Sequence, residues 1–143
     1  MPSVTFKVPG KARPKQRPRV TKRGITFTPK ETRNAEAFVR EIARQAMAGK
    51  EPFEGAIRLS VTVGRSIPRG FSKMKRGRAI AGKVWPTTRP DLDNLVKLIK
   101  DSISGICFRD DSQVVVLHAA KVYSDAEETL VTVEEIDGMN PSE

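Results

Sequence analysis

Cysteine and histidine are almost absent from this sequence of 143 residues, which holds one of each. The single cysteine, Cys107, cannot form a disulfide within the chain, which fits a reducing compartment. Because it is flanked by Ile106 and Phe108, it fits a small core residue better than a reactive thiol. With His118 as the only histidine, a zinc site of the usual Cys/His kind is excluded.

Long apolar runs are missing as well. No run approaches membrane-spanning length, and the N-terminus lacks the basic start and apolar stretch of a signal peptide. Hydrophobic residues make up 38% of the sequence and charged residues 30%, so we expect a modest core with long solvated loops. A chain of this length is most simply one domain spanning residues 1–143. We therefore expect a soluble, cytoplasmic protein with no membrane partner.

Acidic residues are absent from one long part of the chain. Between Gly55 and Pro90 there is no Asp or Glu, but there are nine Lys and Arg. Residues 7–33 contain ten basic residues and a single acid, Glu31, whereas acids predominate after residue 124. The formal net charge is +9. This uneven charge indicates a polyanionic partner, most often nucleic acid, with the acidic C-terminal hairpin and tail directed away from it.

Three segments have the periodicity of strands. Apolar and polar residues alternate over residues 4–8, 57–63 and 129–133. A continuous apolar run at residues 114–117 predicts a buried strand that continues to residue 123. Residues 24–27 predict one further short strand.

Two other segments have helical spacing. The first begins with a predicted capping box, in which Thr28 is the N-cap, Pro29 the first helical residue and Glu31 the third, and it ends at Gly49. The second runs from residue 91 or 92 to Ser104. This order of elements predicts an α+β fold, with two main α-helices packed on a small mixed β-sheet. The predicted apolar face of the first helix consists of Ala35, Phe38, Val39, Ile42, Ala43, Ala46 and Met47.

Two basic segments, residues 9–23 and 64–88, lack any hydrophobic period, and we expect both to be loops. Prolines exclude a helix or central strand in the first, and its nearly uniform charge favours a phosphate-binding loop over a solvated linker. A loop as long as the second is usually functional or disordered. Its Phe71 and Trp85 either stack on exposed bases or pin the loop to the body. The predicted DNA-binding residues are Lys11, Arg13, Lys15, Arg17, Arg19, Arg69, Lys73, Lys75, Arg76 and Arg89.

Four carboxylates interrupt this basic background, at Asp91, Asp93, Asp110 and Asp111. On a regular helix Asp91 and Asp93 would point about 200° apart, so they converge only if Asp91 precedes the helix in an extended conformation. Asp110 and Asp111 are neighbours entering a strand, where successive side chains alternate, so one of them faces the helix start. Lys97 shares a helix face with Asp93.

Carboxylates that are forced together repel one another unless a cation lies between them, and Mg²⁺ is the natural occupant of an all-oxygen site. Beside a phosphate-binding surface, such a site predicts metal-assisted phosphodiester hydrolysis, with Lys97 stabilising phosphate charge or positioning the attacking water. In the alternative interpretation, Asp91 is only a helix cap, Asp93 a first-turn acid and residues 110–111 a turn. Asn94 is likewise either a partner of the acids or a surface amide. Spacing alone does not separate these interpretations.

At these residues the sequence resembles the RusA family of Holliday-junction resolvases. The similarity lies in the segment RPDLDNLVK at 89–97, in Asp101 and Gly105, and in DDSQV at 110–114, and it covers roughly residues 88–123. The segment GKARP at 10–14 and the dipeptide at 28–29 also resemble many members. The resemblance implies a RusA-like fold and a homodimeric, Mg²⁺-dependent endonuclease, with Mn²⁺ as an alternative ion.

The same resemblance assigns roles to individual residues. It implies that Asp91, Asp93 and Asp111 are the metal-binding catalytic acids and that Lys97 is the essential lysine. Beside these four residues, we predict supporting roles for Asn94 and Asp110. The implied substrate is a four-way DNA junction, cut by paired symmetric nicks in recombination and repair. Two alternatives are a nuclease for other branched DNA and a non-catalytic basic nucleic-acid-binding protein.

Overall fold

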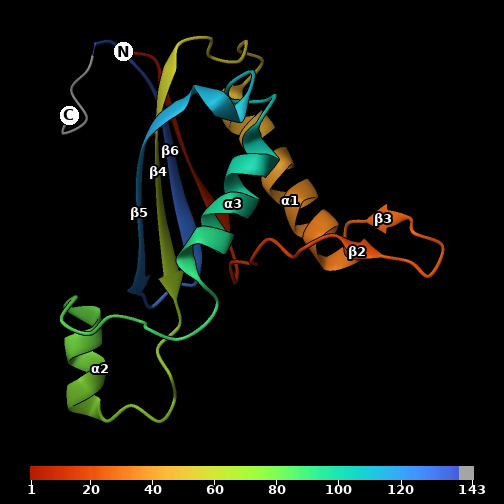
Figure 1. Cartoon of the computed structure of the whole chain (residues 1–143). Helices are drawn as coiled ribbons and strands as arrows, with labels where there is room; N and C mark the ends of the chain where they lie inside the picture. Colours follow the sequence, from red (N-terminus) through yellow and green to blue (C-terminus); the bar gives the residue numbers. More distant parts are fainter. Residues whose placement is uncertain (139–143) are drawn as a thin grey trace.

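A four-stranded mixed sheet forms the centre of the computed structural model, which describes residues 1–138 (Figure 1). The strand order is β1-β6-β4-β5, with antiparallel pairing except between β4 and β5, which are parallel. The sheet confirms the predicted α+β class and the predicted strands. The strands span β1 Ser3–Pro9, β4 Ala56–Arg65, β5 Val114–Tyr123 and β6 Glu128–Ile136.

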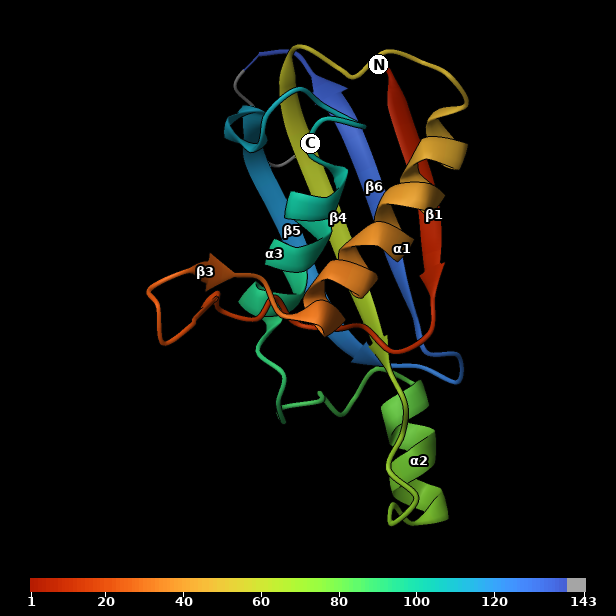
Figure 2. The same ribbon diagram turned by 90° about the vertical axis from the view of Figure 1, so that its right-hand side faces the viewer.

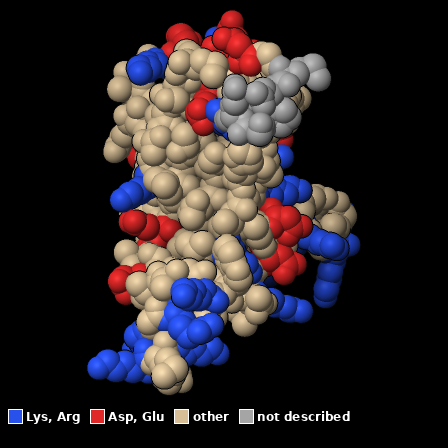
Figure 3. All heavy atoms as spheres, turned by 90° about the vertical axis from the view of Figure 1, so that its left-hand side faces the viewer, with Lys and Arg blue, Asp and Glu red and all other residues tan. Residues whose placement is uncertain are grey.

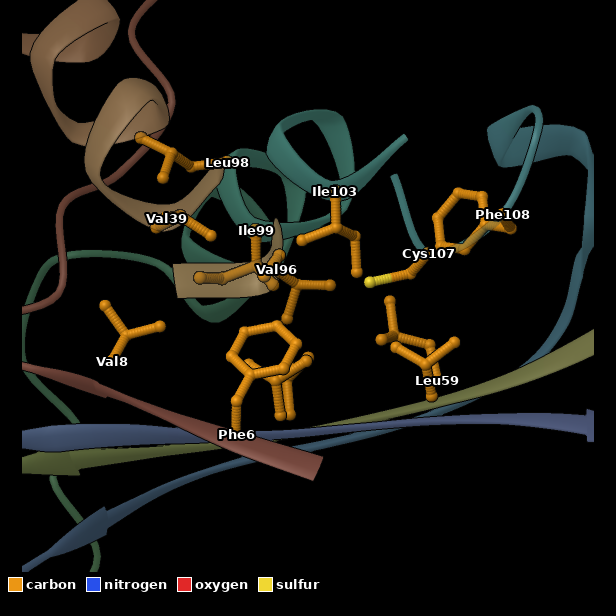
Figure 4. Packing of buried hydrophobic residues seen from close by; sticks show 14 of the residues in the cluster. Phe6, Val8, Val39, Leu59, Val96, Leu98, Ile99, Ile103, Cys107 and Phe108 are labelled. Carbon is orange, nitrogen blue, oxygen red and sulfur yellow. The ribbon is translucent and has the colours of Figure 1, made fainter. Parts of the chain in front are cut away.

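Two long helices, α1 (Lys30–Met47) and α3 (Leu92–Ile103), cover one face of this sheet (Figure 2). Their apolar stripes meet the inward side chains of the strands in one core. Figure 4 shows Val96 and Ile99 of α3 directed toward Phe6 of β1. Cys107 is fully buried there, which confirms its predicted core position, and burial raises the pKa of its thiol to about 12.

The start of α1 differs from the predicted capping box. The N-cap is Pro29, the helix begins at Lys30, and no side chain caps it. The side chain of Gln16, in the N-terminal segment, instead makes hydrogen bonds with the first turn of the helix. The Thr32 hydroxyl donates to Gln16 Oε1 (3.1 Å), and the Glu31 carboxylate accepts from Gln16 Nε2 (3.3 Å). Thr32 thereby takes a buried position on the helix.

Two predictions of burial were also wrong. Phe38 is 49% exposed, because the buried line of α1 runs through Thr32, Val39 and Ala43. β5 is an edge strand rather than a buried one, and its Val115 and Leu117 are 62% and 49% exposed. The apolar run at residues 114–117 therefore does not show that both faces of β5 are buried, because alternate side chains point to a partly covered face and to an exposed face.

The segment predicted as a long loop, residues 64–88, contains a helix. β4 continues to Arg65, and α2 (Lys73–Ile80) follows, with the Ser72 side chain accepting from the Lys75 backbone N–H (3.2 Å). An N-cap and strong helix formers such as Lys, Arg, Met and Ala account for α2 without an apolar stripe. In the first basic segment, β2 (Arg19–Val20) pairs with β3 (Thr26–Phe27), which confirms the short strand near residue 26.

None of the helices in residues 1–138 has the length and apolar character needed to cross a membrane. The predicted acidic C-terminal hairpin was wrong, because β4 lies between β5 and β6 in the sheet and pairs with both of them. The predicted tail beyond Gly138 lies outside the described residues.

Candidate active site

Asp91 lies immediately before α3, as the sequence requires if it is to approach Asp93. It follows the cis Arg89–Pro90 peptide and has extended backbone angles, φ −69° and ψ 139°. It occupies the N-cap position, but its carboxylate makes no capping hydrogen bond. The interpretation of this carboxylate as a helix cap is therefore not supported, and the predicted extended conformation is confirmed.

Asp110 and Asp111 have different surroundings although they are adjacent. The Asp110 carboxylate accepts from the Ser112 backbone N–H (2.9 Å), and Gln113 Oε1 accepts from the Asp110 backbone N–H (2.9 Å), which completes a capping box. The bond from Ser112 lowers the pKa of Asp110. Asp110 is the N-cap of a short 3₁₀ turn, Asp111–Gln113, and β5 begins only after this turn. Only Asp111 is directed to the space beside α3.

That space is an open groove of about 820 Å³ between α3 and the edge strand β5. It brings together Asp93 and Lys97 of α3 with Asp111, and it also includes Asn94. Asp91 is not part of its lining. Lys100 and Asp101 also line the groove, although neither was among the predicted site residues. In the sequence, Asp101 was noted only as part of the pattern that resembles the RusA family. Leu92, Val96, Leu117 and Ala119 supply its apolar walls.

The predicted convergence of three acids is only partly formed. Within residues 1–138, no group of three or more Asp, Glu, His or Cys residues is arranged to hold a metal ion. Asp93 and Asp111 nevertheless share one groove, and both offer the oxygen ligands that Mg²⁺ prefers. Mg²⁺ is commonly held by one or two carboxylates together with substrate phosphates and water. The donor set in the groove therefore fits a divalent ion that is bound together with substrate.

Lys15, a predicted DNA-binding residue, is engaged within the protein. Its ammonium lies 3.0 Å from Glu36 of α1 and 3.4 Å from Asp101 of α3. Burial acts to lower the pKa of Lys15, but the hydrogen bond and charge of Glu36, with those of Asp101, outweigh it and raise the pKa. The Lys15 backbone N–H also donates to the Asn94 carbonyl (2.9 Å). Lys15 thus ties the N-terminal basic segment to both helices.

The other predicted DNA-binding residues are all exposed, on two separate parts of the surface. The first part is the N-terminal segment, with Lys11, Arg13, Arg17 and Arg19. The second part is around α2, and Figure 3 shows Lys and Arg gathered at the lower end of the molecule, where Figure 1 places α2. Exposed Arg78 and Lys83 belong to this second group. The sequence prediction left them out, although they lie in the same run of basic residues. The predicted residues of the second part are Arg69, Lys73, Lys75, Arg76 and Arg89.

Phe71 and Trp85 differ in their surroundings. The Phe71 ring packs edge-to-face on Tyr123 at the end of β5, with ring centroids 5.6 Å apart, which supports its role in pinning the segment. Trp85 is 62% exposed.

Comparison with known proteins identifies the family. The family described as endodeoxyribonuclease RusA matches residues 9–134. An uncharacterized protein of Bacillus subtilis (strain 168), YqaN, is 39% identical over 84 residues, which is 57% of this chain and 59% of that protein. The crossover junction endodeoxyribonuclease rusA of Lactococcus phage r1t is 40% identical over 53 residues, which is 36% of this chain and 40% of that protein.

The aligned parts therefore span about half the length of these two relatives. The family match is broader, since it runs from the N-terminal basic segment to β6 and includes the acid-lined groove. The chain belongs to the RusA family of endodeoxyribonucleases.

Proposed function

We propose that this chain is a Mg²⁺-dependent, structure-selective endodeoxyribonuclease that cuts four-way DNA junctions by paired symmetric nicks. The observation that carries the proposal is the groove in which Asp93, Lys97 and Asp111 lie together, in a chain of the RusA family. Two exposed basic elements, the N-terminal segment and the α2 region, supply positive charge to attract the phosphate backbone. Such an enzyme would act in DNA recombination and repair, in the cytoplasm.

In this proposal Asp93 and Asp111 of the groove would hold the ion. Asp91, whose uncapped carboxylate lies just before the helix and outside the groove lining, would join them when substrate and ion bind. An ion held there, Mg²⁺ or Mn²⁺, would supply Lewis-acid chemistry toward the scissile phosphate and the attacking water. Lys97 lies in the same groove, where its ammonium stabilises the extra negative charge that develops on the phosphate. Asn94 lies in the same groove as a supporting polar residue, and Asp110 would keep Asp111 in place through the capping box.

We further propose that the active form is a homodimer. In the described residues 1–138, Asp93 and Asp111 lie in a single groove, so one chain would make one cut at a time. Symmetric nicks in two opposed strands require two sites related by a two-fold axis, which a pair of identical chains provides.

Cleavage of a labelled four-way junction in Mg²⁺ tests the proposal, with a linear duplex of the same sequence and an EDTA-treated reaction as controls. We expect symmetric nicks near the branch point of the junction, little cutting of the duplex and none in EDTA. Equal cutting of both substrates, or cutting that persists in EDTA, would contradict it. A panel with flaps and three-way branches separates junction resolution from a nuclease for other branched DNA.

A further inference from the structure

Residues 66–88 form a projection, here called the α2 arm, that leaves the sheet after β4 and returns at the start of α3 (Figures 1 and 2). Within this segment Ala79 and Pro86 are the buried residues. The arm therefore contributes little to the hydrophobic core, and its presence calls for a reason other than stability.

The charge of the arm has one sign. It contains six Lys and Arg, all of them exposed, and no Asp or Glu. Lys75 and Arg78 lie three residues apart on α2, a spacing at which like charges destabilise a helix. Two cations have local contacts, since Lys75 lies 4.2 Å from the Phe71 ring centroid and Arg76 donates to the Pro68 carbonyl (3.3 Å). A polyanion that lies along α2 would relieve the repulsion.

Both ends of the arm are fastened to the end of β5. At the entry, Phe71 packs edge-to-face on Tyr123, with an angle of 72° between the rings. At the exit, Lys121 Nζ donates to the carbonyls of Thr88 (2.8 Å) and Pro90 (3.0 Å). Lys121 and Tyr123 are two apart on one strand and share a face of the sheet. This double attachment fixes the base of the arm directly beside Asp91.

A second basic element is fastened to the other side of the same helix start. The backbone N–H of Lys15 donates to the carbonyl of Asn94, in the first turn of α3 (2.9 Å). In Figure 1 the start of α3 lies between α2 and the β2–β3 hairpin, and the two projections leave the body in different directions in Figures 1 and 2. One straight duplex does not follow both of them.

We propose that the α2 arm binds the phosphate backbone of a second duplex of a branched DNA, distinct from the duplex whose backbone enters the acid-lined groove. This inference rests on the proposed function and names the part of the chain that distinguishes a junction from linear DNA. The N-terminal basic segment and the groove hold the strand to be cut. The arm gains its phosphate contacts only when another duplex leaves the branch point in its direction.

The test compares binding of the full chain to a four-way junction and to a linear duplex, in EDTA and over a series of salt concentrations. The variant Lys73→Gln/Arg78→Gln removes two exposed cations of the arm. The control Lys7→Gln/Lys50→Gln removes the same net charge from exposed positions on β1 and after α1. Circular dichroism checks the folding of each variant.

We expect the arm variant to lose at least about tenfold in junction affinity at about 0.1 M salt, with less than about threefold loss for the duplex. Each lost phosphate contact reduces the slope of log affinity against log salt concentration by about 0.9, so the junction slope should fall by about 1.8. The control should weaken both substrates slightly and equally. A variant whose junction-to-duplex affinity ratio equals that of the wild type overturns the inference.

A second variant, Phe71→Leu, keeps every charge but removes the ring that packs on Tyr123. We expect weaker junction binding with an unchanged salt slope, because the same cations remain but the arm is less well positioned. Unchanged junction affinity in this variant overturns the role of the attachment.

These outcomes are separate from those of the proposed function. A wild type that cuts junctions selectively, with an arm variant of unchanged ratio, leaves the nuclease proposal standing and removes this one. A wild type that does not cut contradicts the nuclease proposal, and the binding ratios then decide the inference alone.

Discussion

Asp110 and Asp111 illustrate at the scale of single residues how the backbone assigns different tasks to neighbouring carboxylates. Asp110 uses its carboxylate to accept the Ser112 N–H, while Asp111 starts the next turn and faces the groove opposite Asp93. The Asp110 carboxylate therefore stabilises the local turn, whereas the Asp111 carboxylate is available to bind a ligand.

The hydrogen bond from the Ser112 N–H to the Asp110 carboxylate should make the stability of the fold depend on pH. It lowers the pKa of Asp110 below the ordinary 3.8, so the folded state favours the ionised form. The stabilisation is therefore present above the unfolded pKa and is lost as the pH falls through the folded pKa. We expect the difference in urea midpoint between the wild type and Asp110→Asn to be larger at about pH 6 than at about pH 2.5. A difference that grows on acidification would contradict this account.

Sequence geometry predicted that one of the two acids faces α3 but not which one. The choice depends on the backbone angles at Asp110, φ −148° and ψ 147°, and on the turn that follows. Local periodicity carries no information on such angles, and only the family resemblance pointed to Asp111. The position of Asp91 outside the helix could be stated as a requirement, because Asp91 and Asp93 would point about 200° apart on a regular helix, and Pro90 favours extended backbone at Arg89, just before the helix.

At the scale of elements, Lys15 joins three segments that are distant in sequence. Its side chain is 20% exposed, and its partners Glu36 and Asp101 are 19% and 26% exposed. Removing the lysine leaves two partly buried carboxylates near each other without a counter-charge.

We therefore expect Lys15→Met to lower the free energy of unfolding by about 1–3 kcal/mol, as measured by urea denaturation. The matched control is Lys7→Met, because Lys7 has an exposed pair with Glu128 at 3.6 Å. Its expected loss is below about 0.5 kcal/mol. Equal losses in the two variants would show that the Lys15 ion pairs do not stabilise the fold.

The helix α2 depends on local signals rather than on the core. Replacement of its N-cap, Ser72→Ala, removes the bond to the Lys75 N–H and should cost the helix about 1 kcal/mol. Because α2 buries only Ala79, we expect faster hydrogen exchange of the amides of residues 76–80 with an almost unchanged melting temperature. A lower melting temperature with unchanged exchange in α2 would contradict this description.

Sequence periodicity predicted α1, α3 and the four long strands, because each of them has an apolar face that packs against a neighbour. It missed α2, whose residues have no such face. It also assigned β5 to the interior, because a run of apolar residues does not reveal whether a strand lies at a sheet edge.

At the scale of the whole molecule, acidic residues near the C-terminus make contacts within the fold, whereas the basic residues lie mostly on the exposed surface. Acids of β6 make contacts within the fold, where Glu134 pairs with buried Arg58 (3.0 Å) and Glu135 accepts from two backbone N–H groups. The basic N-terminal segment and the α2 arm are mostly exposed. The acid-lined groove runs along α3, and both basic elements are attached near the start of this helix.

The strand order β1-β6-β4-β5 was not predictable from the sequence, because pairing between distant segments leaves no local period. The groove depends on this order. Parallel pairing of β4 and β5 places the start of β5 at the edge of the sheet beside α3, and with it Asp111.

The central claim is that the groove between α3 and β5 performs metal-dependent cleavage of junction DNA. Its most direct test is the rate of junction cutting in Mg²⁺ by Asp111→Asn, with Asp110→Asn as the neighbouring control. We expect Asp111→Asn to cut at least about 100-fold more slowly while binding the junction as well as or better than the wild type, since a repelling charge is removed. Asp110→Asn should retain most activity, because Asn also caps a turn. Equal loss in both variants, or full activity in Asp111→Asn, would contradict the claim.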